Sequence, residues 1–382
     1  MQSSCTKGSV VYLVLVALVM VFPSWLVAEP SESVPGWPHT DFSRKSIDLS
    51  EVMSGGPPKD GIPSIDSPKF VSLKAAAEWL HAREPVIALV IAGQARAYPL
   101  QILTWHEIVN DTLSGVPVAV TFCPLCNASI VFDRRVNKVV LDFGTTGRLR
   151  KSDMVMYDRQ TESWWQQFTG EGIVGDMTGV ILRQVDSQII AFEDFARAFP
   201  KGEVLSRETG HVRNYGVNPY AGYDNINSFP FLFSGEQDGR LPPMERVLAV
   251  RQGERYTLFP FELLKKEPII HYGKWVIFAH NTVRSALDQT LIAASRDIPV
   301  AAAFEPVVGG QALHFEWRGG KAVDRETGSQ WNVLGQAVSG SLQGAQLKKV
   351  DAGVHFAFAW LAFDAGADVY KARQGKDSSE LP

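Results

Sequence analysis

Two cysteines separated by two residues are the feature of this chain with the clearest chemical potential. Cys123 and Cys126 lie in the string Thr-Phe-Cys-Pro-Leu-Cys-Asn, directly after the apolar run 116–122. The third cysteine, Cys5, belongs to an apolar N-terminal segment. A close pair offers thiolates to a soft metal such as copper or zinc, a short disulfide, or a redox dithiol. The residues alone leave these three interpretations open.

A histidine lies close to the pair along the predicted order of elements. His106 belongs to a predicted short helix, 100–109, which leads into the strand that ends at Cys123. We therefore expect His106 to reach the cysteines as a metal ligand or acid–base group. Glu107 is expected to orient it.

Sulfur and carboxylate groups further along the chain are candidates for a supporting role. Met154 and Met156 lie on a predicted strand, and we expect them to face opposite sides. One would join the core, and the other would offer its thioether beside the thiolates. Asp142 precedes the glycine-rich turn 144–147, where a carboxylate commonly caps the turn.

These residues need elements that bring them together, and the pattern favours strands. Apolar runs bounded by turn residues predict strands at 86–91, 95–98, 117–122 and 128–133. The cysteines would then lie at one end of a buried sheet.

Composition describes a globular chain and excludes one class of partner. Of the 382 residues, 45% are apolar and 20% are charged, and the formal net charge is -4. A nucleic-acid partner would require a basic face, so none is expected. The ten tryptophans, Trp360 among them, would line a ligand groove or pack in the core, and we favour the core.

The N-terminus has the pattern of a targeting segment. Lys7 precedes the apolar stretch 9–21, and a cleavage region ends near Ala28. Residues 1–28 are therefore predicted to be a signal peptide or a signal anchor. Both predictions make the protein exported, periplasmic or extracellular, and the anchor would associate it with a membrane.

The chain also repeats itself. The pattern at 98–103 recurs at 259–264, and Asp158, Arg159 and Trp165 recur as Asp324, Arg325 and Trp331. Because this turn occurs twice, we expect its role to be structural. The predicted fold class is α+β and β-rich, with two homologous repeats packed into one body and short helices.

The predicted organisation has six parts. They are the signal or anchor at 1–28, a Pro/Gly/Ser-rich lead-in at 29–68, a first repeat at 69–205, a connecting segment at 206–246, a second repeat at 247–371, and a flexible tail at 372–382. The second repeat has no cysteine. His280 falls close to the place of Cys123 and is a weaker candidate, whereas His271, His314 and His355 look like ordinary positions.

Several strings of this chain together resemble one family. They are Ala95-Arg96-Ala97-Tyr98-Pro99-Leu100, Trp105-His106-Glu107-Ile108-Val109-Asn110-Asp111, Phe122-Cys123-Pro124-Leu125-Cys126, Met156-Tyr157-Asp158-Arg159, Pro219-Tyr220-Ala221-Gly222-Tyr223, Leu241-Pro242-Pro243-Met244-Glu245-Arg246-Val247 and Trp331-Asn332-Val333-Leu334-Gly335. This set is similar to the domain-of-unknown-function 3179 family. The resemblance implies an exported or membrane-associated microbial protein and carries no activity. Asn127 departs from the family, which often has a small residue such as glycine there.

Two functional hypotheses follow from these observations. The first is an exported protein that binds a soft metal or acts in redox chemistry, with Cys123, Cys126 and His106 at its centre. The second is a non-catalytic extracytoplasmic module whose cysteines form a structural disulfide. The sequence contains no standard hydrolase, phosphate-loop or dinucleotide motif, and it leaves open whether the protein is an enzyme.

Overall fold

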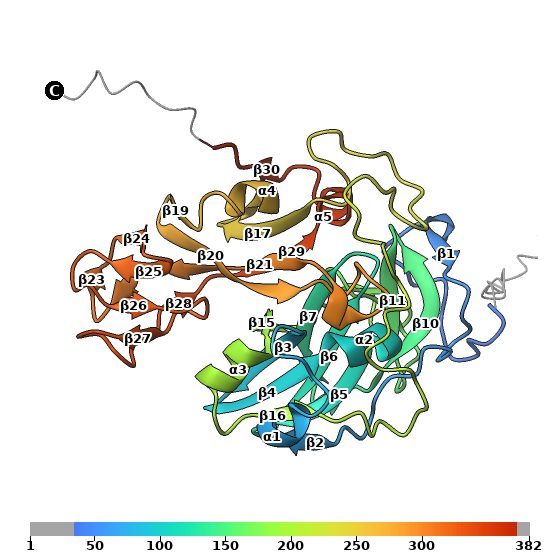
Figure 1. Cartoon of the computed structure of the whole chain (residues 1–382). Helices are drawn as coiled ribbons and strands as arrows, with labels where there is room; N and C mark the ends of the chain where they lie inside the picture. The colour runs from blue at the N-terminus through green and yellow to red at the C-terminus, as the bar shows by residue number, and fades with distance from the viewer. Residues whose placement is uncertain (1–33, 373–382) are drawn as a thin grey trace, which may run out of the picture.

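Strands dominate the part of the chain that the computed structural model describes, residues 34–372 (Figure 1). The helical elements are short: α1 (Leu73–Ala76), α2 (Leu100–His106), α3 (Phe192–Ala198), α4 (Phe261–Leu264), α5 (Ala357–Phe363) and the 3-10 turns η1 (Leu49–Glu51) and η2 (Ile292–Ala294). This confirms a β-rich α+β protein. The predicted signal or anchor at 1–28, and all but the first residue of the predicted tail, lie outside the described residues. Within 34–372, no helix combines the length and apolar character that a bilayer crossing requires.

The first half of the chain builds three sheets and a short hairpin. The first sheet has the order β14-β7-β6-β5, from β14 (Gln184–Val185), β7 (Ala128–Asp133), β6 (Val116–Cys123) and β5 (Ile108–Leu113). The second has the order β15-β3-β4-β16-β2, from β15 (Ser187–Ala191), β3 (Pro85–Ile91), β4 (Gln94–Pro99), β16 (Glu203–Leu205) and β2 (Phe70–Ser72). The third has the order β1-β10-β11-β12-β13, from β1 (Val52–Ser54), β10 (Phe143–Arg150), β11 (Asp153–Asp158), β12 (Trp164–Gln166) and β13 (Gly172–Val174). The hairpin joins β8 (Arg135–Val136) and β9 (Val139–Val140).

The second half builds a corresponding set. One sheet has the order β28-β21-β20-β19, from β28 (Lys348–Lys349), β21 (Asp297–Glu305), β20 (Trp275–Arg284) and β19 (Ile269–Tyr272). Another has the order β29-β17-β18-β30, from β29 (Ala352–Phe356), β17 (Arg246–Gln252), β18 (Arg255–Pro260) and β30 (Asp368–Val369). The last sheet joins β24 (Phe315–Arg318), β25 (Lys321–Asp324), β26 (Gln330–Trp331) and β27 (Ala337–Ser339), and the hairpin joins β22 (Val307–Val308) and β23 (Gln311–Ala312). Apart from the additional edge strands β1 and β2, the strands of the two halves follow one another in the same order within each sheet.

Tight turns set the register of two hairpins of the first half, one of which leads to Cys123. Ala92 and Gly93 join β3 to β4, and Ser114 and Gly115 join β5 to β6. All four residues have positive φ, from 49° to 79°. Two such residues in succession form the turn whose twist matches that of paired strands. The register of β5 against β6 fixes which end of the sheet Cys123 reaches.

The predicted lead-in packs against the body. Its described residues include Trp37 and Phe42, which are buried against the third sheet of the first half. Its strand β1 pairs with β10 along that sheet's edge. The predicted connecting segment contains no helix and no named strand between the end of β16 at Leu205 and the start of β17 at Arg246. Its one isolated bridge pairs Val217 with Leu291.

The largest core cluster surrounds the cysteines and draws on both halves. It joins Cys123 and Cys126 to Phe132 and Met154, and also to Phe356 of the second half. In Figure 1, β29 lies beside β7 near the middle of the molecule. The candidate site therefore lies where the two halves pack together.

Candidate metal centre

The two cysteines flank a tight turn at one end of a buried sheet. Cys123 is the last residue of β6 and pairs with Ala128, the first residue of β7. The turn between them is closed by a hydrogen bond from the Asn127 N–H to the Pro124 carbonyl, 3.3 Å. Asn127 has φ 50°, a conformation that asparagine and glycine adopt more readily than other residues. This explains how asparagine replaces the small residue that the family often has here.

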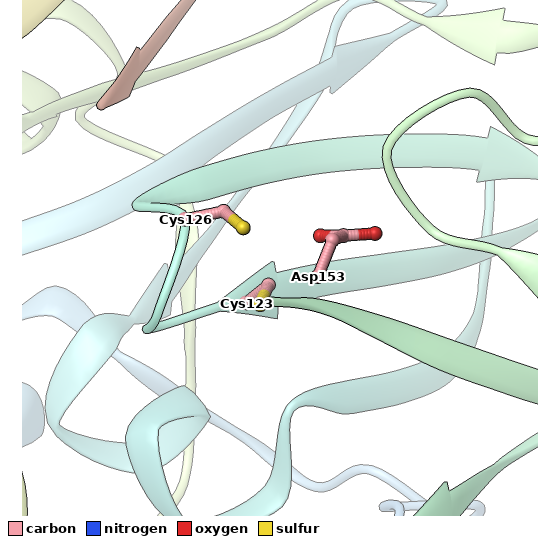
Figure 2. A group of neighbouring side chains, drawn as sticks. All are labelled: Cys123, Cys126 and Asp153. Atoms are coloured by element: carbon pink, nitrogen blue, oxygen red, sulfur yellow. The ribbon is translucent and has the colours of Figure 1, made fainter. Parts of the chain in front are cut away.

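Asp153 completes a cluster that the sequence analysis did not predict. It is the first residue of β11, and it follows a turn in which Lys151 and Ser152 have φ 54° and 67°. Figure 2 shows its carboxyl group beside the two sulfur atoms. The two Sγ atoms and a carboxylate oxygen all lie within 4.8 Å of one another. Two thiols and a carboxyl group so placed could hold one metal ion.

Asp153 is held by N–H donors at one of its two oxygens. Its Oδ2 accepts hydrogen bonds from the Gln166 Nε2, 2.7 Å, and from the Phe168 N–H, 2.9 Å. Its Oδ1 is buried and receives no N–H or hydroxyl hydrogen bond within residues 34–372, and the thiols of Cys123 and Cys126 are its polar neighbours. A buried carboxylate oxygen without such a donor costs free energy, which makes it a natural position for a bound cation.

Burial governs the acidity of the cluster. The exposed fractions of Cys123, Cys126 and Asp153 are 1%, 0% and 0%. Burial raises the pKa of Asp153 to about 7, against the hydrogen bonds from Gln166, Phe168 and the two thiols. Burial also raises the pKa of the Cys123 thiol, and it raises that of Cys126 still further above the usual range. Without a cation, both thiols therefore keep their protons at neutral pH.

Glu107 supplies a second carboxyl group beside the cluster. It ends α2 with φ 59°, and its carbonyl accepts a 2.8 Å hydrogen bond from the Phe122 N–H. The Tyr220 hydroxyl donates to its carboxylate. Burial, and then the neighbouring charge of Asp153, raise the pKa of Glu107 to about 8. The structure thus places this predicted supporting residue beside the cluster itself rather than as an orienting partner of His106.

Residues from two distant segments close the site. The Tyr223 hydroxyl donates to the Leu125 carbonyl, 3.0 Å, and the Phe356 N–H donates to the Cys126 carbonyl, 3.0 Å. Ser152 Oγ donates to the Phe231 carbonyl, 2.6 Å. Tyr220 and Tyr223 belong to one of the strings that resemble the family, and that was the only signal in the sequence that could have found them.

His106 does not join the cysteines. It is fully buried, and its two ring nitrogens contact the Pro63 carbonyl at 2.7 Å and the Tyr215 hydroxyl at 2.6 Å. Burial lowers the pKa of His106 to about 4. His106 is a hydrogen-bonded core residue in this structure.

The methionines also differ from the expectation. Residues two apart in a strand share a face, so the expectation of opposite faces was wrong. Met154 and Met156 are both buried in the same core cluster, with Phe143 and Trp165. Both are accounted for by packing.

Asp142 and His280 lie in other surroundings. Asp142 is half exposed and pairs with Arg134 and Gln160. It caps no turn, because residues 144–147, predicted as a glycine-rich turn, belong to the strand β10. Val276 of β20 pairs with Phe304, as Ala119 of β6 pairs with Phe132. His280 lies four residues after Val276, and Cys123 lies four residues after Ala119. Its place along β20 therefore matches that of Cys123 along β6, but its ring lies tilted against Trp317, with the ring centroids 5.3 Å apart.

The repeated turn residues have structural contacts. Asp158 accepts hydrogen bonds from the Thr161 N–H and the Trp165 Nε1, at 2.7 and 2.8 Å. Asp324 accepts the same bonds from Thr327 and Trp331, at 2.6 and 2.9 Å. The following arginines bind outside the turn, Arg159 to Asp66 and Arg325 to Glu316.

The fold and the site together define a β-rich α+β protein with a buried cluster of two thiols and a carboxyl group. The chain belongs to the family described as "Protein of unknown function (DUF3179)", whose model matches residues 59–366. This confirms the resemblance noted from the sequence. No curated protein and no solved structure matches the chain significantly.

Proposed function

We propose that this protein binds a divalent metal ion of the zinc type through Cys123, Cys126 and Asp153. The observation that carries the proposal is their convergence within 4.8 Å, with no N–H or hydroxyl donor of the described residues at the Asp153 Oδ1. Two thiolates from a C-x-x-C turn and a third protein ligand are a donor set that zinc accepts. Glu107 stands beside this set as a further carboxylate.

The charges around the cluster favour a cation. Cys123, Cys126, Asp153 and Glu107 are all acids, and burial raises the pKa of each one. Their charged forms are unfavourable in the core unless a positive group compensates them. A divalent ion would exchange with their protons and supply that charge.

The carboxylate favours zinc over copper. Cu(I) is soft and prefers sulfur ligands, whereas zinc binds both thiolate sulfur and carboxylate oxygen. The sequence alone left copper and zinc equal, since only the two sulfurs were known. Asp153 adds the hard ligand that separates them.

The redox alternative has less support. Redox-active dithiols usually have a thiol with a lowered pKa in partly exposed, electropositive surroundings. Here both cysteines are buried free thiols, and burial raises the pKa of each. The structural disulfide is the remaining alternative, and a thiol count tests it.

The test is metal content together with competition for zinc. Reduced wild-type protein should take up about one zinc per chain and compete with a chromophoric chelator. Cys123→Ser, Cys126→Ser and Asp153→Asn should each weaken binding by about 100-fold or more, because each removes one ligand. Glu107→Gln should weaken it by about 10-fold, as expected of a group that supports the ligands.

Two control variants keep this test specific. Asp142→Asn removes a half-exposed carboxylate outside the cluster, and Met156→Leu alters the core without removing a proposed ligand. Both should bind zinc as the wild type does. A folded, reduced wild type that binds no zinc would refute the proposal. Blocked thiols that reductant releases would favour the disulfide.

Export belongs to the proposal as well. The apolar N-terminal pattern at 1–28 supports a protein that is secreted or associates with a membrane through that segment. In an oxidising compartment the metal would also protect the thiols from oxidation. Fractionation of cells that express the full chain, compared with a chain lacking 1–28, tests this.

We further propose that the two halves arose by duplication of one unit. Three observations support it: the equal order of strands within the sheets, the equal hydrogen bonds of Asp158 and Asp324, and two matching glycines. A Cβ added at Gly170 would lie 2.7 Å from the Phe132 ring, and one at Gly335 would lie 2.6 Å from the Phe304 ring. The metal site would then be a feature of the first copy alone.

A further inference from the structure

We propose a second site, independent of the metal: a cavity between the two halves that binds a small aromatic carboxylate. The cavity has a volume of about 590 Å³, within the usual size of small-molecule sites. Its walls come from β7 and β15 of the first half and from β28, β29 and α5 of the second.

Three polar atoms of residues that line this cavity have no partner in the described part of the chain. They are Ser129 Oγ, His355 Nδ1 and Trp360 Nε1, all buried and without a hydrogen bond to any residue of the described chain. His355 as a whole is only 3% exposed. Buried polar groups are nearly always paired, so three unpaired ones in a single cavity indicate a missing ligand.

The kinds of unpaired atoms indicate what the ligand carries. The Trp360 N–H can only donate, and the Ser129 hydroxyl can donate as well. Burial lowers the pKa of His355 to about 3, so its ring is neutral near pH 7 and can donate through Nδ1 in one tautomer. Three donors call for a group rich in acceptor oxygens.

The ammonium group of Lys349 favours a negatively charged group on the ligand. Lys349 lines the cavity and donates to the Ser187 carbonyl, which leaves further N–H groups available. The carboxylates that act on this ammonium are Asp186, which is exposed, and Asp351, which also pairs with Arg251. Asp364 accepts from the Gly366 N–H. A carboxylate on the ligand would match both the donors and the ammonium.

Aromatic rings form the apolar wall. Phe168 stacks on Phe363 with ring centroids 4.6 Å apart, and it contacts His355 and Trp360 at 4.9 and 5.5 Å. Such flat surfaces suit a planar ring of the ligand. The combination of a ring wall, donors and an ammonium group identifies an aromatic carboxylate as the ligand class.

The cavity lies directly beside the proposed metal centre. The ring of Phe168 lines the cavity, and its N–H donates to Asp153. Phe356, next to His355, donates its N–H to the Cys126 carbonyl. The two sites therefore share walls, although nothing in the ligand proposal requires the metal.

The test uses two probes, benzoate and 1-naphthoate, on metal-free, reduced protein. Saturation-transfer NMR and calorimetry should show binding with a Kd of about millimolar or tighter. Benzyl alcohol, which keeps the ring but not the charge, should bind at least about tenfold more weakly. Cys123→Ser should leave benzoate binding unchanged. The test of the ligand site therefore does not depend on whether the protein binds zinc.

Conservative variants locate the site. Ser129→Ala, Lys349→Met and Trp360→Phe each remove one donor, and each should weaken benzoate binding by about three- to tenfold. Trp275→Phe is the matched control, because its Nε1 is also buried and unpartnered but outside the cavity. Lys348→Met is the control for the ammonium group, since that side chain is 75% exposed.

Each result bears on the proposal. Binding that weakens in the three cavity variants and not in the two controls supports it. Folded wild-type protein that binds neither probe overturns it. Equal binding of benzyl alcohol overturns the carboxylate assignment, and equal losses in variants and controls overturn the location.

Discussion

Single buried side chains decide what the cysteine cluster can do. Asp153 brings a hard oxygen to two soft sulfurs, and the paired strand and a turn with positive φ hold it there. His106 illustrates the opposite case. Although it adjoins Glu107 in the chain, both of its ring nitrogens are occupied by Pro63 and Tyr215.

Replacing His106 should therefore leave the metal in place. His106→Gln removes a ring whose nitrogens bond outside the cluster, and we expect an unchanged zinc stoichiometry and a Kd within about threefold of the wild type. Stability should fall by about 1–3 kcal/mol, because buried hydrogen-bond partners lose their match. Zinc competition and urea unfolding measure the two effects separately. A loss of zinc from the folded variant would contradict the geometry described above.

His355 should make the protein sensitive to acid. Burial lowers its folded-state pKa to about 3, below its ordinary value of 6.5. As the pH falls below about 6.5, the unfolded chain takes up a proton that the folded chain does not, so stability falls toward pH 3. The contribution reaches at most about 1.4 kcal/mol per pH unit. Above about pH 6.5 this group adds no pH dependence.

Urea unfolding between pH 7 and pH 4 measures this slope. His355→Gln should flatten it, even if the variant is less stable at every pH. His314→Gln is the control, because the side chain of His314 is 68% exposed. Equal slopes for wild type and His355→Gln would show that this histidine does not govern the acid response.

Among the elements, one turn recurs with the same contacts in both halves. In each copy an aspartate that begins the turn accepts bonds from a threonine and from a tryptophan Nε1. Asp158 and Asp324 are both fully buried. The contacts close the turn between β11 and β12, and again between β25 and β26. The first copy of this turn follows the strand that begins with Asp153.

The two aspartates should therefore be equally important for stability. Asp158→Ala and Asp324→Ala should each lower the free energy of unfolding by about 2–4 kcal/mol, because each leaves a buried tryptophan N–H unpaired. Urea unfolding of both variants measures this. Asp176→Ala removes an aspartate that is 57% exposed and should change stability by less than about 0.5 kcal/mol. A large effect in one copy alone would contradict the equivalence of the turns.

On the scale of the whole molecule, the two halves share one core. Phe356 and Phe358 of the second half belong to the same apolar cluster as Cys126 and Phe132 of the first. The backbone of Phe356 also bonds to Cys126. A core shared in this way couples the folding of the halves.

Phe356 should accordingly affect both halves. Phe356→Ala empties a fully buried position and should lower stability by about 3–5 kcal/mol. Wild type and variant should each unfold in a single transition, with coincident curves from far-UV circular dichroism and tryptophan fluorescence. Two separate transitions would show that the halves fold independently.

The local features of the fold were accessible from the sequence. Runs such as 117–122 were predicted as strands because apolar patterns and turn residues act through close neighbours. The cysteine pair and the repeated turn at Asp158 and Asp324 were found for the same reason. Met154 and Met156 were wrongly expected to face opposite sides of their strand, because residues two apart in a strand share a face.

The sequence by itself determined a β-rich chain of this family with two thiols at a strand end, since these properties depend on residues that are adjacent or nearly so. Only the tertiary structure decided what surrounds the thiols. Asp153, Tyr220 and Phe356 reach the cysteines through sheet pairing and packing between distant segments. The same packing created the cavity around His355. No local pattern encodes such contacts, because they depend on how whole sheets associate.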